Sequence, residues 1–235
     1  MPASSSPDAG TPPRTLELAD PPASALRVPT PVPLARDSTV SHWAPVRQAV
    51  GARAHAGGGP TVARLATRTP EGTQNLVLVL RRAVDDRGRL WLEVRLAAGT
   101  VGWVPRAALG GLHAVHTRLV VDRARREATL SRDGRELLRV PVGVGGQRTP
   151  TPAGQFYIRN RLTRYRSPEY GPVAFGTSAR SRITDWPAGG YVGIHGTNRP
   201  DLLPGRVSHG CIRLRNADIL RLERLMPVGT PLTIR

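Results

Sequence analysis

Residues 191–219 read YVGIHGTNRPDLLPGRVSHGCIRLRNADI, and this stretch decides what the fold must bring together. It holds two histidines, a serine, several glycines and the only cysteine of the chain, Cys211. Tyr191 to His195 has the pattern of a short strand and ends directly before a Gly-Thr-Asn turn. We therefore expect His195 at a strand end, where its side chain can face a neighbouring strand that carries Cys211.

Cys211 has the neighbours of a reactive thiol. Gly210 permits a sharp turn before it, so that main-chain N–H groups can converge on an oxyanion. A thiolate needs a base or a nearby cation to form at neutral pH, and the segment offers His195, His209 and Arg213. In an extended conformation His209, Cys211 and Arg213 project from one face, because their positions alternate. The residues predict a nucleophilic cysteine with a histidine base and an arginine that stabilises negative charge.

A metal site is the alternative interpretation of the same histidines. The candidate ligands lack a nearby carboxylate or second cysteine to complete a set. They are His195, His209 and Cys211, with His113 or His116 as a further member. A single histidine or arginine is more often structural than functional, so the prediction rests on the combination. We expect no metal and no organic cofactor.

The charge balance indicates anionic partners. The chain has 235 residues with 34 Lys+Arg against 17 Asp+Glu, a net charge of +17, and every one of the 34 is arginine. Nucleic acid or an anionic wall polymer would fit this charge, and so would plain solubility. The arginines are dispersed and match no nucleic-acid-binding motif, so we expect no nucleic-acid partner.

Cysteine usage and hydropathy narrow the class further. A single cysteine excludes an intramolecular disulfide and a Cys-rich zinc site. The sequence contains no apolar run of about 18 residues, so it predicts no transmembrane helix. The first 40 or so residues also lack the apolar core of a secretory signal, so no signal peptide is visible.

Composition divides the chain into three parts. Residues 1–41 are rich in Pro, Ala, Ser and Thr, which predicts a disordered linker. Residues 42–110 hold short β-type runs, NLVLVLRRAV and RLWLEVRL, and predict a small β-barrel. Residues 112–235 open with alternating runs joined at Asp133-Gly134, a strong hairpin signal because both turn positions tolerate positive φ.

The last part also carries one helical pattern. Asn216 can cap a helix from Ala217 to about Met226, with Ile219, Leu222 and Leu225 on one face. Residues 231–235 then form a last strand. The sequence as a whole predicts a mainly β (α+β) protein, with a small β-barrel followed by a second β domain with few short helices.

Residues 113–235 resemble the L,D-transpeptidase (YkuD-type) catalytic domain. The resemblance is carried by HGTN, a variable stretch, SHGCIRL and an Asn-Ala-Asp helix start. It implies a β-sandwich-like domain in which Cys211 attacks a peptide carbonyl and His195 accepts and returns the proton. The residue between Ser and Gly varies in that family, so His209 becomes a site-lining residue instead of the base. The backbone N–H groups of His209, Gly210 and Cys211 would form the oxyanion hole.

The remaining motif positions have implied roles too. Arg213 matches the basic position after the cysteine, and Ser208 matches the motif serine. We expect Arg213 and Tyr191 to contact substrate, and Ser208 to line the site. No Asp or Asn is obviously placed to orient His195, so the main-chain carbonyl of Gly196 is the candidate.

A second resemblance concerns residues 102–106, Gly-Trp-Val-Pro-Arg. They resemble the last strand of bacterial Src-homology-three-like domains, in which another strand carries a tryptophan, here Trp91. The likeness covers about 60 residues and implies that this domain binds wall components. The alternative is that Trp91 and Trp103 are simply core residues of a small barrel.

The catalytic resemblance implies a peptidoglycan L,D-transpeptidase that forms 3→3 cross-links through a cysteine acyl-enzyme. Its partners would be a donor stem tetrapeptide and an acceptor amine, with roles in cell wall biogenesis and cell shape. It would be secreted, act in the cell wall or periplasm, and be a carbapenem target. The alternatives are an L,D-carboxypeptidase or D-amino-acid exchange enzyme on the same substrate, and a non-catalytic wall-binding protein.

Overall fold

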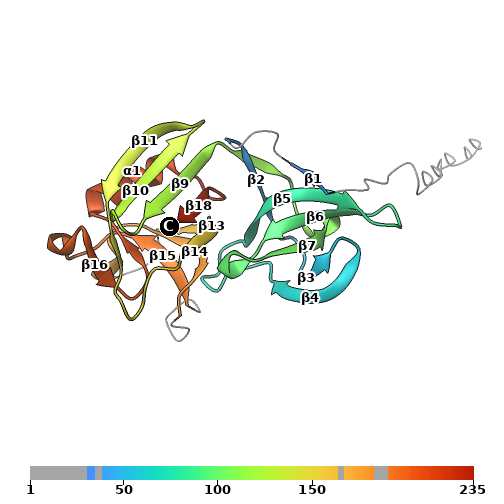
Figure 1. Ribbon diagram of the computed structural model, residues 1–235, viewed down its shortest axis with the longest axis horizontal. Helices are drawn as coiled ribbons and strands as arrows, with labels where there is room; N and C mark the ends of the chain where they lie inside the picture. The colour runs from blue at the N-terminus through green and yellow to red at the C-terminus, as the bar shows by residue number, and fades with distance from the viewer. Residues whose placement is uncertain (1–30, 35–38, 164–166, 183–189) are drawn as a thin grey trace, which may run out of the picture.

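The computed structural model describes residues 31–34, 39–163, 167–182 and 190–235. Within these ranges the chain forms two sheets, of eight and ten strands, and one α-helix (Figure 1). The two sheets lie side by side along the long axis of the molecule. The prediction of a mainly β chain with few short helices is confirmed.

The first sheet is antiparallel throughout the described pairings. Its order is β4-β3-β7-β6-β5-β2-β8, and β1 pairs with the second half of β5. Two short 3-10 turns, Ala97–Gly99 and Arg106–Ala108, flank β7. The strands are β1 (Val32–Pro33), β2 (Ser41–Pro45), β3 (Val50–His55), β4 (Gly58–Leu65), β5 (Leu76–Val84), β6 (Leu90–Arg95), β7 (Val101–Pro105) and β8 (His113–Val115).

Trp91 on β6 and Trp103 on β7 are both buried and pack with Ala83. Trp91 Nε1 donates a 2.9 Å hydrogen bond to a carboxylate oxygen of Asp85, which satisfies the buried indole. Both tryptophans are therefore core residues of the first sheet. Whether this sheet binds wall components stays a prediction.

The ends of the first sheet refine the predicted boundaries. Most of the predicted linker, residues 1–30 and 35–38, lies outside the described residues. Within residues 31–34, Val32 and Pro33 pair with Arg82 and Arg81 of β5, so this piece of the stretch adds a strand. β8 pairs with β2, so His113–Val115 belong to the first sheet.

The second sheet is mixed, in the order β11-β10-β9-β18-β13-β14-β15-β17-β12-β16. The pairs β9–β18, β15–β17 and β12–β16 are parallel, and the other pairs are antiparallel. Short 3-10 turns span Pro168–Tyr170 and Pro200–Leu202. The strands are β9 (Thr117–Asp122), β10 (Glu127–Arg132), β11 (Arg135–Pro141), β12 (Gly143–Gly145), β13 (Gly154–Leu162), β14 (Ala174–Arg180), β15 (Tyr191–His195), β16 (Gly205–Ser208), β17 (Ile212–Arg213) and β18 (Pro231–Ile234).

The predicted hairpin joins β10 and β11 through Asp133 and Gly134, with φ of 49° and 78°. Two positive φ values in a two-residue loop match the twist of the flanking strands. The helix α1 spans Asn216–Leu225, within a residue of the expected range. Its cap position is Arg215 and carries no side-chain cap, so the predicted capping role of Asn216 is wrong.

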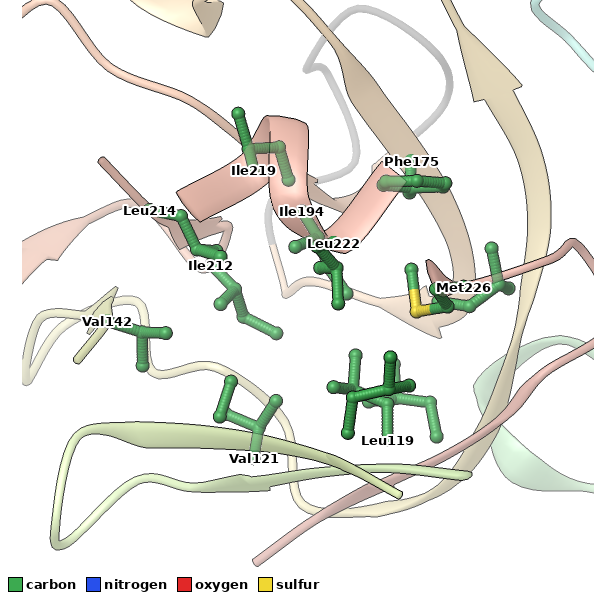
Figure 2. Packing of buried hydrophobic residues seen from close by; sticks show 14 of the residues in the cluster. Leu119, Val121, Val142, Phe175, Ile194, Ile212, Leu214, Ile219, Leu222 and Met226 are labelled. Carbon is green, nitrogen blue, oxygen red and sulfur yellow. The ribbon is translucent and has the colours of Figure 1, made fainter. Parts of the chain in front are cut away.

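The largest apolar cluster lies between α1 and the second sheet. Ile219 and Leu222 of the helix are at most 1% exposed. Figure 2 shows them pointing into the same cluster as Ile194 and Ile212. Burial of this helix face fixes β15 and β17. His195 is the last residue of β15, and Cys211 directly precedes β17.

A separate cluster joins the two sheets. Leu76 and Leu78 of β5 pack with Tyr157 of β13, and the Tyr157 hydroxyl donates a 3.1 Å hydrogen bond to the Leu76 carbonyl. Gly229 lies against the indole of Trp43, has φ of 80°, and has no room for a Cβ. The sheets are thus packed against each other through specific contacts.

Candidate active site

β15 presents His195 beside β17. The two strands run parallel, with His195 opposite Arg213 and Ile194 opposite Ile212. Alternation along β15 puts Gly193 and His195 on one face, which is the face turned to the pocket, while Ile194 enters the core. His195 is 3% exposed, so its ring is held by protein on nearly all sides.

The His195 ring has a fixed orientation. Its Nδ1–H donates a 2.6 Å hydrogen bond to the carbonyl oxygen of Gly196. Because a carbonyl only accepts, this bond places the proton on Nδ1 and leaves the Nε2 lone pair free to take a proton. The ring of Tyr170 packs against His195 at a centroid distance of 4.5 Å. The carbonyl of Gly196 is thus the orienter that was the candidate from sequence.

Asn216 holds the loop that carries this carbonyl. Its Oδ1 accepts a 2.9 Å hydrogen bond from the N–H of Thr197. The same oxygen lies where a Cβ on Gly196 or on Gly171 would be, so both positions require glycine. Asn216 therefore supports the His195 loop instead of capping α1, because its side chain bonds across to the loop and not to the helix N–H groups.

The Ser-His-Gly-Cys turn is fixed by its own serine. The Ser208 hydroxyl donates a 2.5 Å hydrogen bond to the Cys211 carbonyl and accepts one of 3.1 Å from the Gly210 N–H. Gly210 has φ of 121°, which favours glycine. Thr151 Oγ1 donates a further bond of 2.9 Å to the Gly210 carbonyl. These contacts set the direction in which Cys211 leaves the turn.

One part of the expected oxyanion hole is not available. The Gly210 N–H is occupied by Ser208, and Gly210 is buried and does not line the pocket. The expectation that this N–H points to an oxyanion is therefore wrong for this structure. The physical reason is that the tight turn needs an internal hydrogen bond, and the Gly210 N–H supplies it.

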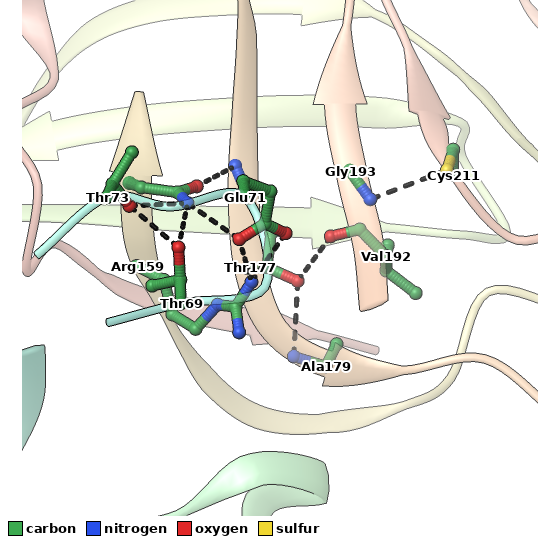
Figure 3. Close-up of polar contacts among 11 residues, drawn as sticks. Thr69, Glu71, Thr73, Arg159, Thr177, Ala179, Val192, Gly193 and Cys211 are labelled. Atoms are coloured by element: carbon green, nitrogen blue, oxygen red, sulfur yellow. Dashed lines mark hydrogen bonds and ion pairs between the residues drawn. The ribbon is translucent and has the colours of Figure 1, made fainter. Parts of the chain in front are cut away.

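The Cys211 sulfur lies close to both β15 and His195. The N–H of Gly193 donates a 3.4 Å hydrogen bond to Sγ, as Figure 3 shows. A methyl group built on Gly193 would lie 3.8 Å from Sγ and 3.7 Å from Cδ2 of His195. Sulfur and imidazole therefore flank the same small gap, and glycine at 193 keeps that gap open.

Burial sets the protonation of this pair. It lowers the pKa of His195 to about 4, an effect opposed by the hydrogen bond to Gly196 and reinforced by the charge of Arg213. Burial raises the pKa of the Cys211 thiol, although the Gly193 N–H and Arg213 act in the opposite direction. Thiol and imidazole are both uncharged at neutral pH. Attack thus requires the proton to pass from sulfur to His195 as the new bond forms.

Arg213 is the cation of the site. It lies opposite His195 on β17, and its buried Nε has no hydrogen-bond partner among the described residues. An unpaired buried guanidinium donor is unfavourable until an acceptor arrives. Its charge favours the thiolate form of Cys211 and disfavours the imidazolium form of His195. In a thiolate–imidazolium ion pair these two effects oppose each other, whereas burial disfavours both charges.

The pocket around these groups is small, with a cavity volume of about 30 Å³. Six of the residues singled out by sequence line it, whereas Gly196 and Gly210 lie behind it. Five lining residues were not predicted, namely Glu169, Tyr170, Ser181, Gly190 and Val192. The lining residues are Glu169, Tyr170, Ser181, Gly190, Tyr191, Val192, His195, Ser208, His209, Cys211 and Arg213.

The other histidines considered as metal ligands are engaged elsewhere. His113 stacks on Trp43 at a centroid distance of 4.3 Å, and His116 bonds Asp133 at 2.7 Å. Among the residues that the structure describes, no three His, Cys, Asp or Glu side chains group as a metal site.

Within the described ranges no helix has the length and hydropathy to cross a membrane.

Comparison with known proteins agrees with this geometry. The family described as the L,D-transpeptidase catalytic domain, YkuD, matches residues 116–234. The Bacillus subtilis protein YkuD, which is named for L,D-transpeptidase activity, is 33% identical over 143 residues, 61% of this chain and 79% of its own length. Its Bacillus licheniformis namesake is 37% identical over 94 residues, 40% of this chain and 50% of that protein.

Among solved structures, the catalytic domain of the E. faecium L,D-transpeptidase is 26% identical to the chain. The superposition covers 51% of this chain and 96% of that domain, with a TM-score of 0.40.

Proposed function

The chain belongs to the L,D-transpeptidase family, and from that membership we propose that it transfers peptidoglycan stem peptides through an acyl-enzyme on Cys211. The observation that carries the proposal is the pairing of Cys211 and His195 across the gap at Gly193. A neutral imidazole with a free Nε2 beside a thiol is the arrangement that nucleophilic catalysis by cysteine requires.

In the first half-reaction the Cys211 sulfur attacks the carbonyl of the L-centre of meso-diaminopimelate in a donor tetrapeptide. The thiol proton passes to Nε2 of His195, and the carbonyl oxygen becomes an oxyanion. The tetrahedral intermediate then breaks its C–N bond, and His195 returns the proton to the departing amine of D-Ala. A thioester on Cys211 and neutral His195 remain.

In the second half-reaction the side-chain amine of a diaminopimelate on an acceptor stem attacks the thioester. His195 accepts a proton from the attacking nitrogen, the C–S bond breaks, and the proton returns to sulfur. The product is a 3→3 cross-link, and the free Cys211 thiol is restored. Each half-reaction uses the same base in both directions, so no metal or organic cofactor enters.

Arg213 supports the charged stages of both steps. Its guanidinium is within electrostatic range of sulfur and imidazole, as its opposite effects on their two charged forms indicate. We propose that its unpaired Nε–H binds the oxyanion or the substrate carboxylate. The N–H groups of Cys211 and His209 complete the oxyanion site, while Tyr191 contacts the donor peptide.

The membership also supports an extracytoplasmic place of action, in the cell wall or periplasm, because the substrate lies there. We propose further that residues 42–110 form a separate domain that contacts wall polymer, which the net charge of +17 supports. Sedimentation with purified sacculi tests this contact. Binding that disappears between about 50 and 500 mM salt would support it, since only exposed charges are screened over that range.

The catalytic proposal is tested on a disaccharide-tetrapeptide substrate. We expect the wild-type chain to give a cross-linked dimer with loss of one D-Ala, as seen by mass spectrometry, and Cys211→Ala to give none. Equal behaviour of the two proteins would overturn the mechanism. Release of D-Ala without dimer would instead identify water or a free D-amino acid as the acceptor, and addition of D-amino acids separates these two outcomes.

A carbapenem supplies a second readout of the same thiol. We expect one mass adduct on the wild-type chain, located on the peptide that contains Cys211, and none on Cys211→Ala. This measurement does not depend on the acceptor. It would also exclude a non-catalytic wall-binding protein with a vestigial site.

A further inference from the structure

The loop between β4 and β5, residues 66–75, reaches from the first sheet onto the second. Its Glu71 carboxylate accepts two hydrogen bonds from one nitrogen of Arg159 on β13, at 2.8 and 3.0 Å. It accepts a third, at 3.0 Å, from Nδ2 of Asn160. Figure 3 shows the network, in which Glu71 is the anionic centre. These contacts join residues 88 and 89 positions apart in the sequence.

Burial of both partners distinguishes this ion pair from the other ion pairs among the described residues. The Arg159 side chain is 5% exposed and that of Glu71 is 12% exposed. The pair formed by Arg161 of the same strand with Glu223 is 52% and 23% exposed. A buried guanidinium without its carboxylate is strongly unfavourable, whereas an exposed pair contributes little. Glu71 therefore fixes where the Arg159 guanidinium lies.

Arg159 in turn contacts the wall of the catalytic pocket. Its guanidinium carbon lies 3.6 Å from the centre of the Tyr191 ring, and that of Arg180 lies 4.4 Å from it. Tyr191 lines the pocket that contains Cys211 and His195. It also lines the groove between the two sheets, together with Arg159 and residues of the β4–β5 loop. A continuous set of contacts thus runs from Glu71 through Arg159 to Tyr191.

The pocket is narrow enough for this contact to matter. With a cavity volume of about 30 Å³, the pocket changes shape when one lining ring moves. Tyr191 begins β15, the strand in which Gly193 bonds the Cys211 sulfur and which His195 ends. The reacting groups themselves are held by contacts within the second sheet, to Gly196 and Ser208. Loss of Glu71 would therefore displace the Tyr191 ring in the pocket wall more than it would displace Cys211 and His195.

We infer that Glu71 of the β4–β5 loop is a positioning residue that acts through Arg159 to hold Tyr191 as the peptide-binding wall of the catalytic pocket. The inference rests on the proposed function for its substrate, a stem tetrapeptide. It assigns the first sheet a role in substrate binding at the second-sheet site, separate from any contact with wall polymer.

The first test compares Glu71→Gln with Glu223→Gln in the full chain, with the disaccharide-tetrapeptide as substrate. Both variants remove a carboxylate partner from an arginine of β13, and only the first arginine contacts Tyr191. We expect Glu71→Gln to raise KM about tenfold, the effect of losing one well-placed aromatic contact, with kcat changed less than about twofold. Glu223→Gln should leave both constants at wild-type values. An unchanged KM, or a loss confined to kcat, would overturn the inference.

The second test asks whether the effect passes through Tyr191. We expect Tyr191→Ala to raise KM, and Glu71→Gln/Tyr191→Ala to have the same KM as Tyr191→Ala within about twofold, because the wall is already absent. Effects that multiply would show that Glu71 acts by another route. If Glu71→Gln does not fold, Glu71→Asp, which keeps the charge but shortens its reach, takes its place in both tests.

A measurement without substrate separates this inference from the proposed function. We expect amide hydrogen exchange at residues 191–195 to be about tenfold faster in Glu71→Gln than in Glu223→Gln, because β15 loses its anchored first residue. Equal exchange would refute the positioning role even in an active enzyme. A wild-type chain that turns over no stem peptide would refute the proposed function, and faster exchange in Glu71→Gln would still support the coupling.

Discussion

The two sheets contribute to the site in different ways. The second sheet carries every group proposed to touch the reacting atoms, and most of them lie within the short segment from Gly190 to Arg213. The first sheet reaches the pocket only indirectly among the described contacts, through Glu71 and Arg159 to Tyr191. The reactive groups are local in sequence, and the support that shapes the pocket wall comes from a distant loop.

This difference predicts two kinds of variant. Changes to the reacting groups of the second sheet, Cys211 and His195, and to their support should act on kcat, because they alter proton transfer and charge stabilisation. Changes in the contacts between the sheets should act on KM or on stability, because they alter the wall and the packing. Each prediction below tests that division.

The largest effect is expected for His195→Asn. The Asn amide can still donate to the Gly196 carbonyl, but it offers no lone pair to accept the thiol proton. We expect kcat to fall about 10²- to 10⁴-fold, the usual contribution of a general acid–base group, with KM nearly unchanged. The measurement is steady-state turnover of the disaccharide-tetrapeptide.

A thermal melt provides the control for His195→Asn. The variant should stay folded, since the hydrogen bond to Gly196 is retained. A fall in kcat of less than about tenfold would show that His195 is not the base and that another group on the pocket wall takes the proton.

The candidate reactive residues lie within one short segment of the sequence, and the structure brings them to one pocket. His195 ends β15 and Cys211 directly precedes β17, and these two strands pair, so a short separation in sequence brings the two residues to one pocket. The orienting carbonyl of Gly196 follows His195 and was the candidate before the structure was known. What the local pattern could not show was hydrogen bonding inside the turn, which removes the Gly210 N–H from the site.

The rest of the pocket was not predictable in this way. Glu169 and Tyr170 come from a short 3-10 turn whose only signal is the run Pro-Glu-Tyr-Gly-Pro. That run predicts a turn but does not show which part of the fold the turn contacts. Asn216 had the pattern of a helix cap, but tertiary contact with Thr197 decided its role. Glu71 gave no signal at all, because a single carboxylate in a loop becomes meaningful only beside Arg159.

The fold shows the same division between local and distant information. The Asp133-Gly134 hairpin, the strand Tyr191–His195 and the helix near residues 216–225 were read from periodicity and turn residues. The strand order of the second sheet was not, since two of its parallel pairs, β9–β18 and β12–β16, join segments far apart in the chain. Pairing of β1 with β5 also depends on contact with an existing sheet edge.

The second prediction concerns pH and tests the burial of His195. Only the neutral imidazole accepts a proton, so activity should be lost as the pH falls through the pKa of about 4. With an ordinary pKa near 6.5, a few per cent of activity would remain at pH 5, whereas about nine-tenths should remain with the lowered pKa. The pH profile of kcat/KM distinguishes the two, and half-maximal activity near pH 6.5 would contradict the buried site.

Stability should change over the same range. The unfolded chain binds a proton at His195 near pH 6.5, and the folded chain binds it only near pH 4. The free energy of unfolding therefore falls as the pH drops across that window. In His195→Asn this part of the pH dependence should be missing, which urea titrations at several pH values would show.

The third prediction tests support within the second sheet. Asn216→Ala removes the acceptor for the Thr197 N–H and loosens the loop that carries the Gly196 carbonyl. We expect kcat to fall about tenfold, since a misplaced carbonyl is a second-order effect compared with a missing base. Asn216→Asp keeps the acceptor oxygen and should retain most of the activity. A rise in KM with kcat unchanged would contradict the proposed division, in which support within the second sheet acts on kcat.

The smallest effect is expected for Tyr157→Phe, which separates docking of the sheets from positioning of the pocket. Burial raises the pKa of this phenol, so it stays a neutral donor to the Leu76 carbonyl. Its removal should lower the free energy of unfolding by about 1–2 kcal/mol, the loss of one buried hydrogen bond. Neither kcat nor KM should change, because no hydrogen bond or ring contact among the described residues joins Tyr157 to Tyr191. If Tyr157→Phe raised KM as Glu71→Gln does, general loosening of the interface would explain both variants, and the specific route through Arg159 would fail.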